Sequence, residues 1–506
     1  MTARRNRAIR ISVPVSKAKR LRLSTGVCSA MALFGLVLLA GCKPVGPNYS
    51  RPAYQAPAVY KEENVAASHA GGVGWQAAAP SDDLLRGKWW EIYQDQQLNH
   101  LEEQIAPSNQ TLRAALESYL AAHDQIKAAR SSLFPTLSAG PSITRNNISA
   151  NSYSYSSSKP TSYGDFQIGG QASWEPDFWG RIRRTVEATR ENAQASAADL
   201  ATLDLGLHAE LAQDYFALRG IDSQSRLLQS TVADYEHQLD LTRRLLAGGI
   251  GTEADVAQAN TQLETVRAQL IGVEQTRTQY EHAIATLANL TAGELNVAPA
   301  PLDLPLPAIP VGLPSQLVER RPDIAAVERR VAAANAQIGI AVSAYYPTIT
   351  LGGAGGFESL NAGTWIQGPS SLWSLGAQAT ELLFDAGRRH ALSDEAHHSY
   401  EAQAATYKAT VLGAFNEVED KLSDLRILNS ELAAERKAVV AAQHSLDISN
   451  QRYKGGAASY LEVLVAESTL LTNQRTQADL ESRQFAASVQ LVRALGGGWN
   501  ASQLPK

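Results

Sequence analysis

The chain has 506 residues, of which 44% are hydrophobic, and its 45 Lys and Arg face 50 Asp and Glu. This length and apolar content support a large folded core and exclude an intrinsically disordered protein. The acidic balance is not interrupted by any basic stripe, so phosphate backbones would be repelled and nucleic acid is excluded as a partner.

Residues 1–41 have the composition of an export signal. All eight basic residues before residue 42 lie in a stretch without acids, and the apolar run VCSAMALFGLVLLA follows them. That run is short for a transmembrane helix and has the position of a signal-peptide core. Removal of this signal peptide would leave 37 basic against 50 acidic residues, which changes the formal charge from −5 to −13.

The sequence LAGC at 39–42 resembles a bacterial lipobox, whose cysteine is acylated and becomes the new N-terminus. We therefore expect lipidation, including palmitate, at Cys42. Two or more acyl chains hold a protein stably on a membrane. Cys28 lies in the leader, so no disulfide is expected in the exported chain. Lys43 stands where inner-membrane lipoproteins commonly have Asp, which is consistent with passage to the outer membrane.

Two copies of one alternating nonamer predict strands, FQIGGQASW at 166–174 and WSLGAQATE at 373–381. Side chains alternate faces along a strand, so each copy has one apolar and one polar face. The Ser/Tyr-rich stretch at 149–163, which alone could be a flexible linker, then indicates the loop of a strand hairpin. GGAGG at 352–356 lacks the Lys-Ser/Thr of a phosphate loop and indicates a glycine-rich strand.

A long helical hairpin follows the first strand pair. Apolar residues recur at helical spacing between Thr185 and Ala247 without a proline, which predicts a helix of roughly 95 Å. The glycines of AGGIGTE can end that helix and reverse the chain. The next helix has a coiled-coil seam in which only Arg277 is charged. The seam residues are Val256, Ala259, Leu263, Val266, Leu270, Val273, Arg277, Tyr280, Ile284 and Leu287.

The second half of the chain repeats the first. The segment 121–137 corresponds to 333–349 with an offset of 212, and the segment starting at 245 corresponds to that at 452 with an offset of 207. The change of offset predicts an insertion in the strand region of the first repeat. Asn473, Gln477 and Gln484 interrupt the second seam, so either this hairpin is the looser one or these residues face water along a lumen.

Each repeat thus supplies two strands, and four strands cannot close a barrel. Open strand edges are not tolerated in lipid, so several chains must share one barrel. Two chains would give eight strands around a filled interior, whereas three would give twelve strands around a passage. We favour three.

Several strings together resemble the outer-membrane factor family, the TolC-like trimeric channels, in its lipoprotein branch that serves resistance-nodulation-division efflux pumps. These strings are LAGC, WWEIYQDQQLNHL, SLFPTL, WEPDFWGRIRR, ERRPDIAAVERRVAAANAQIGIAVSAYYPTITL and RYKGGAASYLEVLVAES. The resemblance implies a mixed α and β fold: a trimeric transmembrane β-barrel with four strands per chain and twelve in all, continuous with a long periplasmic α-helical coiled-coil barrel.

The expected organisation follows from the repeats and this resemblance. It comprises a signal peptide at 1–41, an acylated periplasmic segment at 42–100, a first repeat at 101–297, a Pro-rich linker at 298–314 and a second repeat at 315–498. The implied location is the cell outer membrane, lipid-anchored with a periplasmic extension. The implied partners are two further copies of the chain, outer-membrane lipid, a periplasmic adaptor protein and an inner-membrane efflux pump.

The resemblance also assigns a periplasmic gate and the tips that contact the adaptor. Tyr453, Glu462 and the position of Val465 form the gate; the family has an acid at the last position, so this chain keeps one gate carboxylate. Without the resemblance, Glu462 is simply a carboxylate on a helix surface, and the glycines simply make turns. The expected adaptor-contacting tips are Gly249, Gly251, Thr252, Gly455, Gly456 and Ser459.

No arrangement of reactive groups predicts an enzyme, and we expect no catalytic residue, metal or cofactor. His390 and His397 lie two helical turns apart, a spacing more typical of a solvated helix face than of a metal site. The predicted function is a passive exit channel that expels small molecules in multidrug resistance. The alternatives are the duct of a one-step protein secretion system and a non-channel coiled-coil lipoprotein, and the transported substrate is not predicted.

Overall fold

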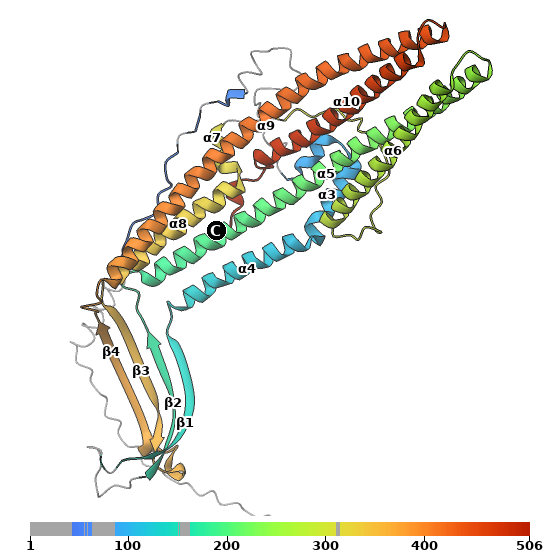
Figure 1. Ribbon diagram of the computed structural model, residues 1–506. Helices are drawn as coiled ribbons and strands as arrows, with labels where there is room; N and C mark the ends of the chain where they lie inside the picture. The colour runs from blue at the N-terminus through green and yellow to red at the C-terminus, as the bar shows by residue number, and fades with distance from the viewer. Residues whose placement is uncertain are drawn as a thin grey trace, which may run out of the picture.

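The computed structural model describes residues 43–54, 56–57, 59–62, 87–149, 151, 162–309 and 314–505. The signal peptide, Cys42 and most of the 149–163 loop lie outside these residues. The described chain is elongated, with a small sheet at one end and two helical hairpin tips at the other (Figure 1). Among the described residues, no helix combines the length and apolar character needed to cross a membrane.

Four strands form one antiparallel sheet, and the sheet joins the two halves of the chain through its central pair, β2 and β3. Phe166 lies opposite Ser359 and Trp174 opposite Leu351 in that pair. Both nonamers, apart from Glu381 at the end of the second, and GGAGG therefore lie in strands, as predicted. The strands, in sheet order, are β1 (Thr136–Asn147), β2 (Ser162–Trp174), β3 (Thr348–Ser359) and β4 (Ser371–Thr380).

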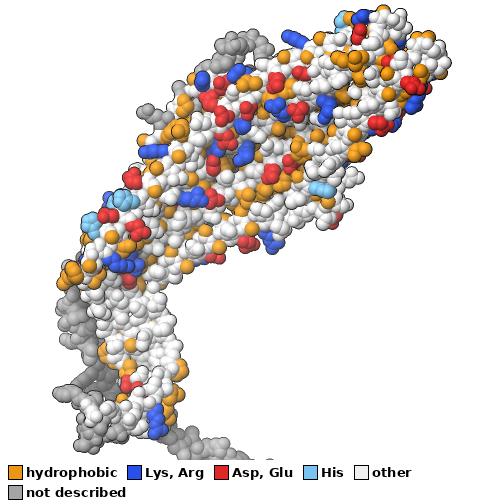
Figure 2. All heavy atoms as spheres, viewed as in Figure 1, with side chains coloured by type: hydrophobic (Ala, Val, Ile, Leu, Met, Phe, Trp, Pro, Cys, Tyr) orange, Lys and Arg blue, Asp and Glu red, His pale blue; other side chains and the backbone are white. Residues whose placement is uncertain are grey.

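The strand register places the alternating apolar positions on one face of the sheet. Leu137, Ala172 and Leu375 align across it through Gly353, and Leu137 and Leu375 are 81% and 80% exposed. The opposite face carries mainly Ser, Thr, Gln and Gly. On the side shown in Figure 2, charged side chains are spread over the helices and are sparse over the strands. The prediction of one apolar and one polar face is confirmed.

The helices repeat as the strands do, and each strand pair has a helix before it and a helical hairpin after it. The offset is 212 between α4 and α8 and between β1 and β3, whereas it is 207 between α5 and α9 and between α6 and α10. The insertion therefore lies in the first strand pair, as predicted. The sequence analysis did not assign the helices before the strands. These helices are α4 (Gln110–Ser131) and α8 (Pro322–Ser343), and the hairpins are α5 (Arg181–Ala247) with α6 (Glu253–Leu287) and α9 (Arg388–Lys454) with α10 (Tyr460–Ala494).

The residues of the first seam are buried or half-buried, as predicted, and the structure explains its charged member. Leu263 and Val266 are 3% and 0% exposed within the hairpin. Arg277 reaches from α6 to Asp222 of α5, with Nε 2.8 Å from Oδ1. In the second seam Gln484 is only 7% exposed, so within this chain it does not face water.

Shorter elements and extended segments wrap the middle of the helices. Trp89 and Tyr93 are buried against them, and the Tyr93 hydroxyl lies 2.8 Å from that of Ser488 on α10. Residues 297–302 are held by α5: Arg219 donates to the Ala298 carbonyl at 2.8 Å. The shorter helical elements are η2 (Trp89–Tyr93), α3 (Gln96–Ser108), α7 (Pro314–Arg320), η3 (Ala362–Thr364), η4 (Gly368–Ser370) and η5 (Ala501–Gln503).

Candidate functional site

The two helical hairpins end in turns of the same geometry, at the end of the molecule opposite the sheet (Figure 1). Gly249 has a φ of 75° and Gly456 a φ of 71°. The left-handed region costs a side-chain-bearing residue energy, so these two positions need glycine to reverse the chain. The neighbouring Gly455 ends α9, where its amide donates to the Gln451 carbonyl at 3.0 Å. These turn-making roles are present whether or not a partner contacts the tips.

The helices that leave the two turns begin differently. Thr252 and Asp255 form a capping box on α6, in which the Asp255 amide donates to the Thr252 hydroxyl at 3.2 Å. Gly251 leads directly into this cap. Ser459, the counterpart of Thr252 in the second repeat, makes no side-chain cap bond on α10. Glu462, the counterpart of Asp255, is therefore free for another contact.

Glu462 pairs with a residue that the sequence analysis did not assign. Arg452, in the last turn of α9, donates from Nη1 to Glu462 Oε2 at 3.0 Å. The two side chains are 53% and 45% exposed, so the ion pair lies at the surface of the single chain. Arg452 also donates to the Ala457 carbonyl at 3.4 Å, across the turn. In the sequence, Arg452 directly precedes Tyr453, and this position next to a proposed gate residue was the signal that could have indicated the ion pair.

Tyr453 points into the chain, whereas Val465 points out of it. The Tyr453 ring centroid lies 5.6 Å from that of Tyr460, and burial raises the pKa of the Tyr453 hydroxyl. The Tyr453 side chain packs against the apolar cluster that includes Leu239 of α5. Tyr453 thus contacts the first hairpin of the same chain. Val465 is 58% exposed and lies one helical turn from Leu461, which is 54% exposed. The two residues border a groove of about 430 Å³ between α9 and α10.

The N-terminal segment is fixed where the sheet meets the helices. The Val45 amide donates to the Trp179 carbonyl at 3.0 Å, and Pro44 packs so closely on Gly180 that a Cβ there would lie 2.5 Å from it. The buried Arg184 donates to the Val45 carbonyl at 3.2 Å. Pro44 and Val45 thus lie where β2 ends and α5 begins, and Cys42 lies outside the described residues.

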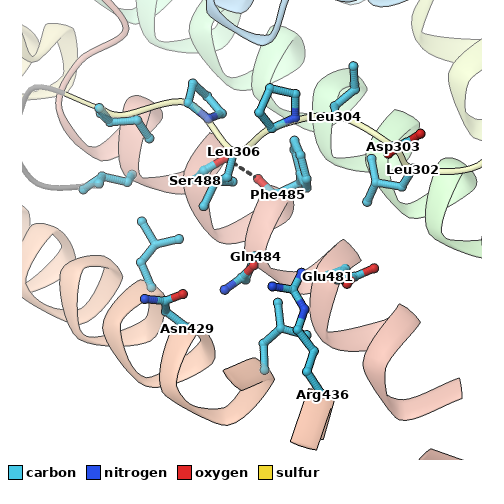
Figure 3. A pocket seen from close by; sticks show the side chains of 16 residues that line it. Leu302, Asp303, Leu304, Leu306, Asn429, Arg436, Glu481, Gln484, Phe485 and Ser488 are labelled. Atoms are coloured by element: carbon cyan, nitrogen blue, oxygen red, sulfur yellow. Dashed lines mark hydrogen bonds and ion pairs between the residues drawn. The ribbon is translucent and has the colours of Figure 1, made fainter. Parts of the chain in front are cut away.

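A cavity of about 450 Å³ lies between the Pro-rich linker and the α9–α10 hairpin. Leu304 and Leu306 come from the linker side, and Gln484 and Asn429 from the helices (Figure 3). Arg436 pairs with Glu481 at 3.0 Å on its border. These groups do not form a reactive set that could carry out catalysis.

The histidine-rich stretch is a solvated helix face. His390 is exposed on α9 and its Nδ1 lies 2.8 Å from Asp394 Oδ2, one helical turn away. His397 is exposed on the same helix. Within the described parts of the chain, no three His, Cys, Asp or Glu residues are grouped so that they could hold a metal ion.

Comparisons with known proteins agree with this architecture. Residues 101–290 and 313–497 match the family described as outer membrane efflux protein. A pyoverdine export outer membrane protein of Pseudomonas aeruginosa is 30% identical, over 94% of this chain and 98% of its own length. An antibiotic efflux pump outer membrane protein of Pseudomonas putida is 30% identical, over 91% and 94%.

Solved structures of outer-membrane channels are similar over most of the chain. The outer-membrane channel OprN superposes with a TM-score of 0.82 at 29% identity, covering 90% of this chain and 99% of its own. The open state of the MtrE outer membrane channel of Neisseria gonorrhoeae superposes with a TM-score of 0.77 at 26% identity, covering 91% and 99%.

Proposed function

This chain belongs to the outer membrane efflux protein family, and on that premise we propose that it is the outer-membrane exit channel of a tripartite efflux system. The channel is passive and is formed by three copies of the chain. A periplasmic adaptor and an inner-membrane pump dock at its helical end, and the pump supplies the energy. The chain itself contributes the passage, not chemistry.

The sheet is the single observation that carries this proposal most strongly. β1 and β4 have no strand partner beyond the sheet within the described residues, and one face is apolar and exposed. Backbone groups at such edges need hydrogen-bond partners in lipid. Pairing β4 of one copy with β1 of the next satisfies both edges, and three copies make a twelve-stranded barrel wide enough for a passage.

The relatives differ in the substrates that their names give. Their names refer to pyoverdine, antibiotics and toluene. We propose that small molecules are the substrates here as well, and that the two hairpin turns are the contacts for the adaptor. Tyr453, Glu462 and Val465 are the proposed gate residues at that same end.

The proposed anchor is acylated Cys42. The placement of Pro44 and Val45 against the sheet–helix junction supports it, because the barrel enters the membrane at that level. Cys42→Ser should abolish incorporation of labelled palmitate while the chain remains folded. Label persisting in this variant would show that the acylated residue is elsewhere.

The proposed channel is tested by mass measurement in detergent and by conductance in planar bilayers. We expect three chains per particle and single-channel openings that depend on the protein. A stable monomer without conductance would contradict the proposal. Cysteine cross-linking tests whether the tips contact the adaptor. Cysteines at Gly251 and Ser459 should cross-link to a co-purified adaptor, whereas a cysteine at Ile271, on the exposed middle of α6, should not.

A further inference from the structure

Resting on the proposed function, we propose that the gate of this chain is closed by apolar contact and that its charge is set by Arg452. In this arrangement Arg452 neutralises Glu462 within each chain, and Leu461 and Val465 of three copies form an apolar constriction. The gate then lacks the cation preference that a ring of free carboxylates would give.

The charges at the second hairpin tip support the proposal that Arg452 neutralises Glu462. Residues 452–465 contain Arg452, Lys454 and Glu462, a formal charge of +1 per chain. The corresponding residues 245–258 of the first hairpin contain only Glu253 and Asp255, a formal charge of −2. The second tip, where the gate is proposed, thus has more basic than acidic groups over these residues, whereas in the first hairpin the basic residues, Arg243 and Arg244, come just before them.

The contact of Glu462 decides how much of its charge is available. Its Oε2 accepts from Arg452 at 3.0 Å, and the Ser459 side chain makes no capping bond at the start of α10. In the first hairpin the counterpart Asp255 is used by the Thr252 cap instead. An ion crossing the gate therefore meets a paired carboxylate with a guanidinium beside it, and the two fields largely cancel.

The exposure of Leu461 and Val465 supports the proposal that these residues form an apolar constriction. Leu461 and Val465 lie four residues apart, hence on one face of α10, and both are more than half exposed. The buried face of the same turns is already filled by Val463 and Ala466. The counterparts of the exposed pair in the first hairpin are Ala254 and Gln258. The apolar face therefore belongs to the second hairpin alone.

The occupant of this face is a second copy of the chain. A threefold arrangement brings equivalent residues together around one axis, so each Leu461 and Val465 can pack against those of the neighbours. Burial of such side chains is favourable, and a narrow apolar constriction excludes water and ions without needing charge. Substrates that are neutral or anionic would meet no acidic barrier when the constriction opens.

Reversal potentials in planar bilayers under a KCl gradient test the charge assignment. Arg452→Gln should shift the channel toward cations, Glu462→Gln should shift it toward anions, and the double variant should return close to the wild-type value. Lys454→Gln, whose side chain lies at the same tip without the ion pair to Glu462, is the matched control and should give a smaller shift that the Glu462 change does not reverse. Unchanged selectivity in Arg452→Gln would overturn the role of Arg452.

Resting conductance tests the apolar constriction. Leu461→Ser with Val465→Ser should raise the resting conductance several-fold, whereas Ala254→Ser with Gln258→Ser in the first hairpin should leave it unchanged. Val465→Asp should create cation preference. Unchanged resting conductance in the serine pair would place the constriction elsewhere and overturn this part. A wild-type chain that forms no channel at all would instead contradict the proposed function, and particle mass would separate the two failures.

Discussion

Asp222 holds the Pro-rich linker onto the first hairpin, and Asp222→Asn should loosen it. The side chain is 2% exposed. Its carboxylate accepts from Arg277 Nε at 2.8 Å, from Arg219 Nη1 at 3.3 Å and from the Ala300 amide at 3.0 Å. The Asn side chain has nearly the same volume, but it replaces one acceptor oxygen with a donor and removes the charge that two arginines face.

The expected loss of unfolding free energy depends on which partners Arg277 and Arg219 keep. Breaking a buried ion pair by removing one partner costs about 3–5 kcal/mol. Arg277 keeps Glu281 and Arg219 keeps the Ala298 carbonyl, so we take the lower end, about 3 kcal/mol per chain. The unfolding entropy of a chain this long is roughly 1 kcal/mol/K, from about 2.1 cal/mol/K per residue, so Tm should fall by only about 3 °C.

Hydrogen exchange measured by mass spectrometry is the more sensitive assay. If the linker opens locally, about 3 kcal/mol corresponds to roughly a hundred-fold loss of protection in the peptide containing Ala300. The matched control is Asp240→Asn on the same helix, since the Asp240–Arg244 pair is largely exposed. Unchanged protection at Ala300 in Asp222→Asn would refute the reasoning, because the linker would then be held by other contacts.

Three further predictions concern the buried His208–Glu102 pair, the tips and the sheet. Burial raises the pKa of Glu102 to about 7, and Asp204 together with Glu102, whose carboxylate lies 2.6 Å from Nδ1, outweighs burial and raises the pKa of His208 to about 9. Both values lie above the unfolded values of about 4.3 and 6.5, so the folded pair binds more protons than the unfolded chain and stability falls as pH rises from about 4.5 to 9. Replacing both groups, in Glu102→Gln with His208→Asn, should therefore flatten the fall of Tm between pH 5 and pH 10, and an unchanged slope would contradict this. Thr252→Ala should lower the stability of the first turn of α6 by about 1 kcal/mol, which faster amide exchange there would measure. Ser459→Ala should leave amide exchange in α10 unchanged, because Ser459 makes no cap bond. Trp373→Arg on the apolar face should reduce insertion into liposomes, with a cost of about 2–4 kcal/mol for arginine in lipid, whereas Ser374→Arg on the polar face should insert normally; equal insertion of both variants would show that the faces were assigned wrongly.

The strands and hairpins could be predicted because their patterns have short, regular periods. Alternation over nine residues fixes which side chains share a face, and the register of the sheet follows from it. The seam of α6 has a heptad period. Its one charged residue, Arg277, lies where the structure has an ion pair between α6 and Asp222 of α5. The repeat offsets placed the insertion because α8 and β3 keep the offset of 212.

The helices before the strands could not be read in the same way. α4 has no buried residue in the single chain, so its apolar residues do not mark a packed face. α8 has the opposite problem, because it is buried on many sides and its alanine-rich sequence has no clear period. Helical periodicity is visible only when one face is buried and the other is not.

The contacts of the candidate site were hidden for a different reason. Arg452 and Glu462 are ten residues apart and meet only because the turn at Gly456 brings the helix ends together. Glu102 and His208 are 106 residues apart. A spacing pattern carries no information on such pairs until the path of the chain between them is known.

The central strand pair imposes an order on folding. The strands β1 and β2 are close in sequence, as are β3 and β4, but Phe166 and Ser359, which face each other in the central pair, come from different halves of the chain. Local hairpins form quickly, whereas closing so long a loop is slow. Until neighbouring copies arrive, the two free edges can pair with any exposed strand, which favours aggregation. The final step should therefore depend on protein concentration, and a chaperone that covers strand edges during transit would raise the yield of native assemblies.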